Sequence, residues 1–121
     1  MISYTIQGKV SSKKNENKFN RLTGRTYKTE RFRSWHSSAM WQMRAQPRPK
    51  SPISHPVKVS VTFYHGDLRR KDGDNGLSAV MDLLVDAKVL SDDKWIIVRK
   101  LEVENVLDRK NPHTDITIEE Y

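Results

Sequence analysis

Apolar residues at every second position of residues 57–64 constrain the fold more than any other feature of this chain. Successive side chains of a β-strand point to opposite faces, so this alternation predicts a strand that turns one face toward a core. The apolar positions are Val57, Val59, Val61 and Phe63. A strand of this kind needs a second layer, made of helices or another sheet, to cover its apolar face.

An amphipathic helix is predicted to follow this strand and to supply that layer. It begins near Asp74 or Asn75 and ends near Lys88, and its apolar positions recur at helical spacing. These positions are Leu77, Val80, Met81, Leu84 and Val85. Residues 95–103 then predict a further strand that is apolar on both faces at its start, which favours a central position in the sheet.

A first helix is predicted over residues 29–44, where Thr29 can cap its start. Its apolar face consists of Phe32, Trp35, Ala39 and Met43. Trp41 falls on the opposite face, either by chance or as an interface or stacking residue. Residues 2–6 alternate as a short strand, and Ile116 and Ile118 mark a last one.

The remaining segments are predicted to be connections. Residues 8–28 are polar and basic and indicate a loop, and the prolines of residues 46–56 exclude a helix there. The order β-α-β-α-β-β indicates an α+β fold, that is, a two-layer α/β arrangement with a mixed sheet and two helices. A length of 121 residues fits one domain, residues 1–121.

The charges are distributed unevenly along the chain. Residues 1–50 carry twelve Lys and Arg against two acids, and residues 51–121 carry ten against thirteen acids. The first half should therefore attract a polyanion such as nucleic acid. The alternative interpretation is a basic surface that serves only to keep the protein in solution. The net charge is +7, and the chain has no cysteine, which excludes disulfides and Cys-based zinc sites.

No segment of the sequence predicts a membrane partner. The longest apolar run, residues 95–98, is too short to cross a bilayer, and the first residues lack the regions of a signal peptide. A cytoplasmic protein is the expectation.

Aspartates gather between residues 72 and 93 and suggest a metal site. They are Asp72, Asp74, Asp82, Asp86, Asp92 and Asp93. In an extended backbone Asp72 and Asp74 would point the same way, and Asp93 could approach them if the chain doubles back after the helix. Carboxylates held in this way suit Mg²⁺ or Mn²⁺. Arg69, Arg70 and Lys71 directly precede them and could hold DNA phosphates beside a metal that polarises the scissile one.

Each aspartate also has a local explanation. Asp72 or Asp74 could cap the helix, Asp92 and Asp93 could form a turn, and Asp82 could lie on a solvated face. The spacing alone supports these structural roles and a metal site about equally.

Residues 69–84 followed by Ser91, Asp92 and Asp93 resemble the RusA family of Holliday junction resolvases. The shared pattern is a basic pair, a D-x-D-N segment (residues 72–75), a helix that contains an Asp, and a paired Asp before the next strand. The basic residues 12–15 and 24–28 are similar to the family's loop ahead of its first helix. The resemblance implies a homodimer that binds a four-way DNA junction and nicks it symmetrically with Mg²⁺, in a bacterial cell or a phage-infected bacterium.

The resemblance also implies which residues act. The metal-binding and catalytic acids would be Asp72, Asp74 and Asp93, with supporting roles for Asn75, Asp82 and Asp92. DNA contacts are expected from basic residues in two segments, residues 9–28 and 69–71. These residues are Lys9, Lys13, Lys14, Lys18, Arg21, Arg25, Lys28, Arg69, Arg70 and Lys71.

Two alternative functions remain, one from a difference between this chain and the family pattern and one from the range of substrates that metal nucleases cut. The family's lysine after the D-x-D-N segment is Ser78 here, which favours a junction-binding accessory protein with weak or no cutting activity unless Lys71, Lys88 or Lys94 replaces that charge. A metal nuclease that acts on RNA or on flaps is the third hypothesis.

Overall fold

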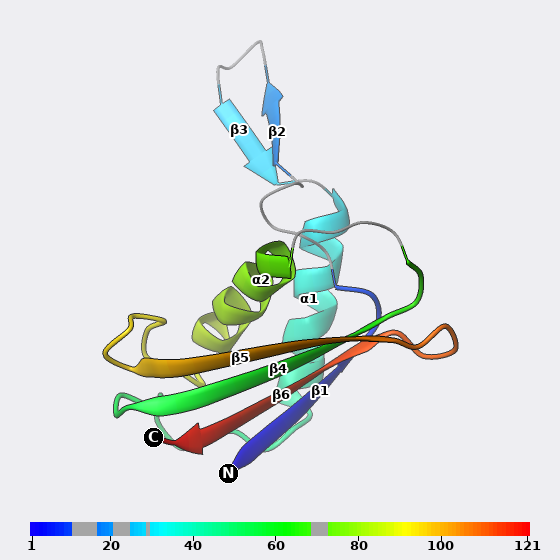
Figure 1. Ribbon diagram of the computed structural model, residues 1–121. Coiled ribbons are helices and arrows are strands. Elements are labelled where there is room, and N and C mark those ends of the chain that lie inside the picture. The colour runs from blue at the N-terminus through cyan, green and yellow to red at the C-terminus, as the bar shows by residue number, and fades with distance from the viewer. Residues whose placement is uncertain (11–16, 21–24, 29, 69–72) are drawn as a thin grey trace.

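A computed structural model describes residues 1–10, 17–20, 25–28, 30–68 and 73–121 of the chain, and describes residues 17–20, 25–28, 30–32 and 73–75 by their backbone path. Four strands form a mixed sheet: β1 (Ile2–Gln7), β4 (Val57–His65), β5 (Val98–Leu107) and β6 (His113–Glu120). Helices α1 (Glu30–Arg44) and α2 (Gly73–Asp86) cover one face of this sheet (Figure 1). The α+β fold expected from the sequence is therefore confirmed.

The strands lie in the order β1-β6-β4-β5. The pairs β1–β6 and β6–β4 are antiparallel, and β4–β5 is parallel. Helix α2 is the crossover between the two parallel strands. Both strands consequently run in the same direction, and α2 returns the chain from the carboxyl end of β4 to the amino end of β5.

The core lies between the sheet and the two helices. The alternating apolar residues of β4 are at most 2% exposed, and the alternation of β6 places Ile116 and Ile118 on the same buried face. Among the α1 side chains that the structure describes, Trp35, Ala39 and Met43 are buried, as the helical spacing predicts. The side chain of Phe32, the fourth residue of the predicted face, lies outside them. Trp41 lies on the opposite face of α1 and is 68% exposed.

The outer edge of β1 is covered by two glutamines. Gln46 accepts a hydrogen bond from the Thr5 backbone N–H (3.0 Å) and donates one to the Thr5 carbonyl (3.0 Å). Gln42, one turn earlier, makes the same pair of contacts with Gln7, at 2.7 and 3.2 Å. These side chains satisfy backbone groups that an edge strand otherwise leaves open to pairing with another chain.

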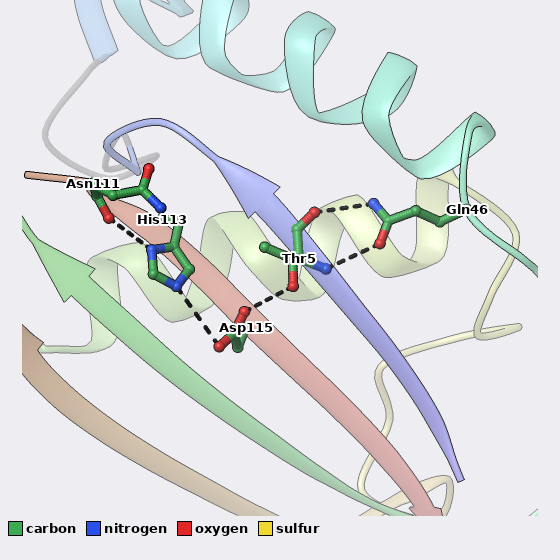
Figure 2. A network of polar contacts seen from close by, with 5 residues as sticks. All are labelled: Thr5, Gln46, Asn111, His113 and Asp115. Atoms are coloured by element: carbon green, nitrogen blue, oxygen red, sulfur yellow. Dashed lines mark hydrogen bonds and ion pairs between the residues drawn. The ribbon is translucent and has the colours of Figure 1, made fainter.

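A polar network continues from this edge across the open face of the sheet (Figure 2). The Thr5 hydroxyl donates to one carboxylate oxygen of Asp115 (2.9 Å), and the other oxygen lies 3.7 Å from Nε2 of His113. The His113 ring in turn lies 2.7 Å from the Asn111 carbonyl and stacks on Tyr64. The contacts link β1, β6 and the turn before β6, and thereby help to fix the register of the antiparallel strands.

The strand predicted over residues 95–103 differs in position and in bounds. Trp95 and Ile96 lie in a turn closed by the hydrogen bond from the Ile97 N–H to the Lys94 carbonyl (3.0 Å), so the strand begins only at Val98. β5 is an edge strand and not a central one. The prediction was wrong because Trp95 and Ile96, which made the start of the segment apolar on both faces, are 74% and 54% exposed in the turn and are not part of the strand.

The segment predicted as a loop over residues 8–28 contains a two-stranded hairpin. β2 (Asn17–Asn20) and β3 (Arg25–Lys28) pair antiparallel with Asn17 opposite Lys28. Phe19, Thr26 and Tyr27 are residue types that favour extended backbone, but they are interspersed with Lys, Arg and Asn, so the polar composition masked the strand signal. Figure 1 shows the hairpin beyond the amino-terminal ends of the two helices, apart from the sheet.

None of the helices in the described ranges is long and apolar enough to cross a membrane.

Candidate active site

The first turn of α2 places two of the predicted site residues. Asp74 and Asn75 follow Gly73 in this turn, where the exposed N–H groups and the helix dipole favour bound anions. Gly76 lets the turn approach the sheet closely, since a Cβ at this position would lie 3.3 Å from two ring carbons of Phe63. The amino terminus of α2 is thereby held against the carboxyl end of β4. Asp72 and the basic triplet of residues 69–71 lie outside the described residues.

The second pair of predicted acids follows the other end of α2. Asp92 accepts a hydrogen bond from the Asp93 backbone N–H (2.7 Å) and lies 3.6 Å from the Lys94 ammonium. The backbone hydrogen bond, with Lys94 adding to it, lowers the pKa of the Asp92 carboxyl below its ordinary value and so favours the ionised form. Asp92 is therefore engaged in its own turn, whereas Asp93 next to it is an exposed residue.

Helix α2 separates the two groups of acids. A helix of 14 residues is about 20 Å long. Asp74 lies in its first turn, and Asp93 precedes β5, whose start lies beside the start of β4. The expectation that the chain doubles back to bring Asp93 close to Asp74 is not met within a single chain, because a parallel crossover puts the exit of one strand and the entrance of the next at opposite ends of the sheet. Asp72 lies outside the described residues.

The other polar residues of α2 lie between these ends. Ser78 and Asp82 are one turn apart and half-buried. Asp86, in the last turn, lies 3.1 Å from Nε2 of His36 on α1. Among the side chains that the structure describes, those of residues 1–10, 33–68 and 76–121, no group of three or more His, Asp or Glu is placed to hold one metal ion.

The predicted DNA-binding residues fall into three groups. Lys9 lies beside the sheet and pairs with Asp67 at 3.3 Å. The β2–β3 hairpin, described by its backbone, carries Lys18, Arg25 and Lys28. The others lie outside the described residues, and they are Lys13, Lys14, Arg21, Arg69, Arg70 and Lys71.

Two surfaces of the structure were not defined by the sequence interpretation, which singled out Trp41 alone as an interface or stacking residue. One is the outer edge of β5, where Leu101, Val103 and Leu107 are 41%, 41% and 44% exposed. By register with β4 they belong to the helix-facing side of the sheet, but α2 leaves them open. The other is a cationic groove between α1 and the end of α2. The apolar residues of β5, which alternate with charged ones, were the sequence signal for the first surface. The position of Trp41 on the polar face of α1 was the sequence signal for the second.

Comparison with known proteins gives two matches. The family model described as endodeoxyribonuclease RusA matches residues 7–119. A crossover junction endodeoxyribonuclease RusA from Aquifex aeolicus (strain VF5) is 29% identical over 83 residues. That alignment covers 65% of this chain and 65% of the relative, so the matched part spans slightly less than two thirds of the relative's length.

Proposed function

This chain belongs to the RusA family of endodeoxyribonucleases, and on that premise we propose that it resolves four-way DNA junctions by paired, metal-dependent nicks. The observation that carries the proposal is the family match over residues 7–119, which includes every aspartate of the candidate site. A nuclease that acts on recombination intermediates works where the DNA is, so we place it in the cytoplasm of a bacterial cell or of a phage-infected bacterium.

We further propose that Asp72, Asp74 and Asp93 hold a divalent ion, Mg²⁺ or Mn²⁺. Three carboxylates fit a hard cation that prefers oxygen ligands, although α2 separates Asp74 from Asp93 within one chain. Such an ion would polarise the scissile phosphate and help to ionise the attacking water. Asn75, Asp82 and Asp92 would have supporting roles, and the turn contacts of Asp92 support a role in orienting the backbone of Asp93.

A second copy of the chain would remove the geometric difficulty. The two edges of the sheet differ: glutamines cover β1, whereas no strand of the described residues pairs with the outer edge of β5. An open edge with exposed apolar residues such as Leu101 and Val103 favours pairing with an identical edge. We therefore propose a homodimer in which two β5 strands pair antiparallel about a twofold axis.

This pairing would join acids from different copies. In an antiparallel β5–β5 pair, the start of one β5 lies beside the end of the other. Asp93 of one copy would then lie at the end of the joined sheet where the second copy's β4 exits toward Asp72 and Asp74. Each of the two active sites would draw acids from both copies, and the two sites would be related by the twofold axis, as two symmetric nicks require.

DNA binding is assigned to the basic residues at the same end of the helices as Asp74. The β2–β3 hairpin carries Lys18, Arg25 and Lys28, and the triplet of residues 69–71 directly precedes the acids. The basic residues of these two segments would bind the phosphate backbone beside the proposed metal ion.

The test is incubation of the purified protein with an end-labelled four-way junction, with and without Mg²⁺. We expect paired nicks at symmetric positions with Mg²⁺ and no cutting with EDTA, while a linear duplex of the same sequence stays intact. Tight binding without cutting in Mg²⁺ or Mn²⁺ would favour the accessory protein that Ser78 suggests. Preferential cutting of flaps or RNA would favour the third hypothesis.

The composite site is tested by mixing two inactive variants. Asp74→Asn and Asp93→Asn would each inactivate both sites of their own homodimer. When the two variants are mixed in equal amounts, half of the dimers would contain one copy of each variant. Each mixed dimer would have one site with all acids intact and one site without. About a quarter of all sites would then be active, and the nicking rate should return to about a quarter of the wild-type rate. A mixture that stays as inactive as its components would contradict the composite site while leaving the proposed activity untouched.

A further inference from the structure

A groove runs between α1 and the carboxyl end of α2, at a distance from the candidate acids at the start of α2. It consists of two adjoining hollows of about 570 and 560 Å³, both lined by Met40, Arg44 and Asp86. Trp41 lines the first hollow, and the second continues past the segment that follows α1 to Lys88. The groove lies on the outer surface of the helical layer.

The groove is cationic. Five exposed basic side chains line it, Arg33, Arg44, Arg48, Lys50 and Lys88. The acid in its lining is Asp86, which already lies 3.1 Å from the His36 ring. A row of guanidinium and ammonium groups, with its carboxylate in contact with a histidine of the same lining, is complementary to a chain of phosphates.

Trp41 adds a flat aromatic surface to this row. Its side chain is 68% exposed, and the Arg44 guanidinium lies 5.1 Å from the centre of its ring. An exposed indole beside cations is the combination with which proteins bind single strands, since bases stack on the ring while phosphates meet the charges. A regular duplex keeps its base faces stacked on one another and cannot use such a ring.

Lys88 gives an independent indication. It follows the end of α2 with a φ of 63°, the left-handed conformation that a glycine adopts at much lower cost. The hydrogen bonds of this turn, from Lys88 N–H to the Val85 carbonyl (3.1 Å) and from Val89 N–H to the Leu84 carbonyl (3.0 Å), hold it there. A lysine in a strained position is typical of a residue whose side chain is used.

We propose that this groove binds a single-stranded stretch of DNA, with a base on Trp41 and phosphates on Arg44, Arg48, Lys50 and Lys88. The inference rests on the proposed function for its biological setting, because unpaired nucleotides occur where the arms of a branched DNA meet. In this proposal the groove has a role separate from cutting. The groove holds one strand, while the acids at the two ends of α2 hydrolyse another part of the DNA.

The first experiment measures the affinity of the full chain for a fluorescent twelve-nucleotide oligothymidylate in EDTA, where no cutting occurs. Trp41→Ala should weaken binding about tenfold. Arg44→Ala combined with Lys50→Ala should lower the slope of log affinity against log salt by about 1.4, because each cation that no longer meets a phosphate lowers it by about 0.7. Failure of junction cutting would not affect this measurement, which separates the inference from the proposed activity.

Matched variants elsewhere serve as controls. Trp95 is 74% exposed and also lies beside an arginine, with Arg99 5.8 Å from its ring centre, so Trp95→Ala removes a comparable pair from another surface. Arg109→Ala combined with Lys110→Ala removes two charges from the turn before β6. We expect both controls to bind like wild type. Equal weakening in the groove and control variants, or none in the groove variants, would overturn the proposal, as would an equal weakening for a duplex of the same length.

Lys88→Gly separates binding from folding. Glycine relieves the strain at φ 63°, so the unfolding midpoint should rise by about 2–5 °C while oligonucleotide binding weakens several-fold. Weaker binding by a stabilised protein cannot come from misfolding. A stabilised variant with unchanged affinity and salt slope would overturn the proposal.

Discussion

Asp74→Asn should reduce junction cutting at least about a thousandfold while junction binding stays equal or becomes tighter. The substitution keeps the shape of the side chain in the first turn of α2 but removes the charge that would hold the metal ion. Removal of a negative charge beside DNA phosphates favours binding. Single-turnover cleavage at saturating Mg²⁺, together with a binding titration in Ca²⁺ or EDTA, measures the two effects separately.

The control for this variant is Glu120→Gln, which removes one exposed charge at the end of β6, far along the sheet from the start of α2. Its cutting rate should remain within about twofold of wild type, since surface substitutions of this kind have small effects. If Asp74→Asn cut as fast as this control, Asp74 would not be a metal ligand.

Val103→Lys should convert the dimer into monomers of 14.1 kDa and abolish cutting together with dimerisation. Val103 is 41% exposed in the single chain, so a lysine there has access to solvent and should leave the fold intact. In a β5–β5 pair the same lysine would be buried beside the apolar edge of the second copy, at a cost of about 2 kcal/mol or more for each copy. Sedimentation velocity at micromolar concentration distinguishes the two states.

Thr117→Lys is the matched control, because it adds the same charge to the open face of the central strand β6. It should sediment as a dimer. A dimeric and active Val103→Lys protein would place the interface elsewhere, and a wild-type protein that sediments only as a monomer would remove the basis for shared active sites.

The periodic elements of the fold could be predicted from the sequence, but their neighbours could not. Alternation in β4 and helical spacing in α1 and α2 indicate which face of an element is covered, and the buried residues confirm these faces. The same signal in residues 95–103 was assigned to the middle of the sheet. Coverage by a neighbouring strand and coverage by a second chain produce the same apolar sequence, so only the strand order separates them.

The candidate site shows a similar limit. The spacing of Asp72, Asp74 and Asp93 is visible in the sequence, yet spacing along the chain does not give direction in space. Once β4 and β5 are known to be parallel, the crossover helix must separate the exit of one from the entrance of the other. The sequence selects these aspartates as candidates, whereas the separation of Asp74 from Asp93 by the length of α2 required the topology.

The glutamines on β1 also determine how far assembly can proceed. A subunit whose sheet offered two bare edges could add neighbours on both sides and grow into an open-ended fibre. Gln42 and Gln46 hydrogen-bond to the backbone of β1, so each subunit would have one sheet edge left, that of β5, to which another strand could be added. In the proposed homodimer, growth by this route would end when two subunits have paired through β5, which would give a closed pair and not a filament.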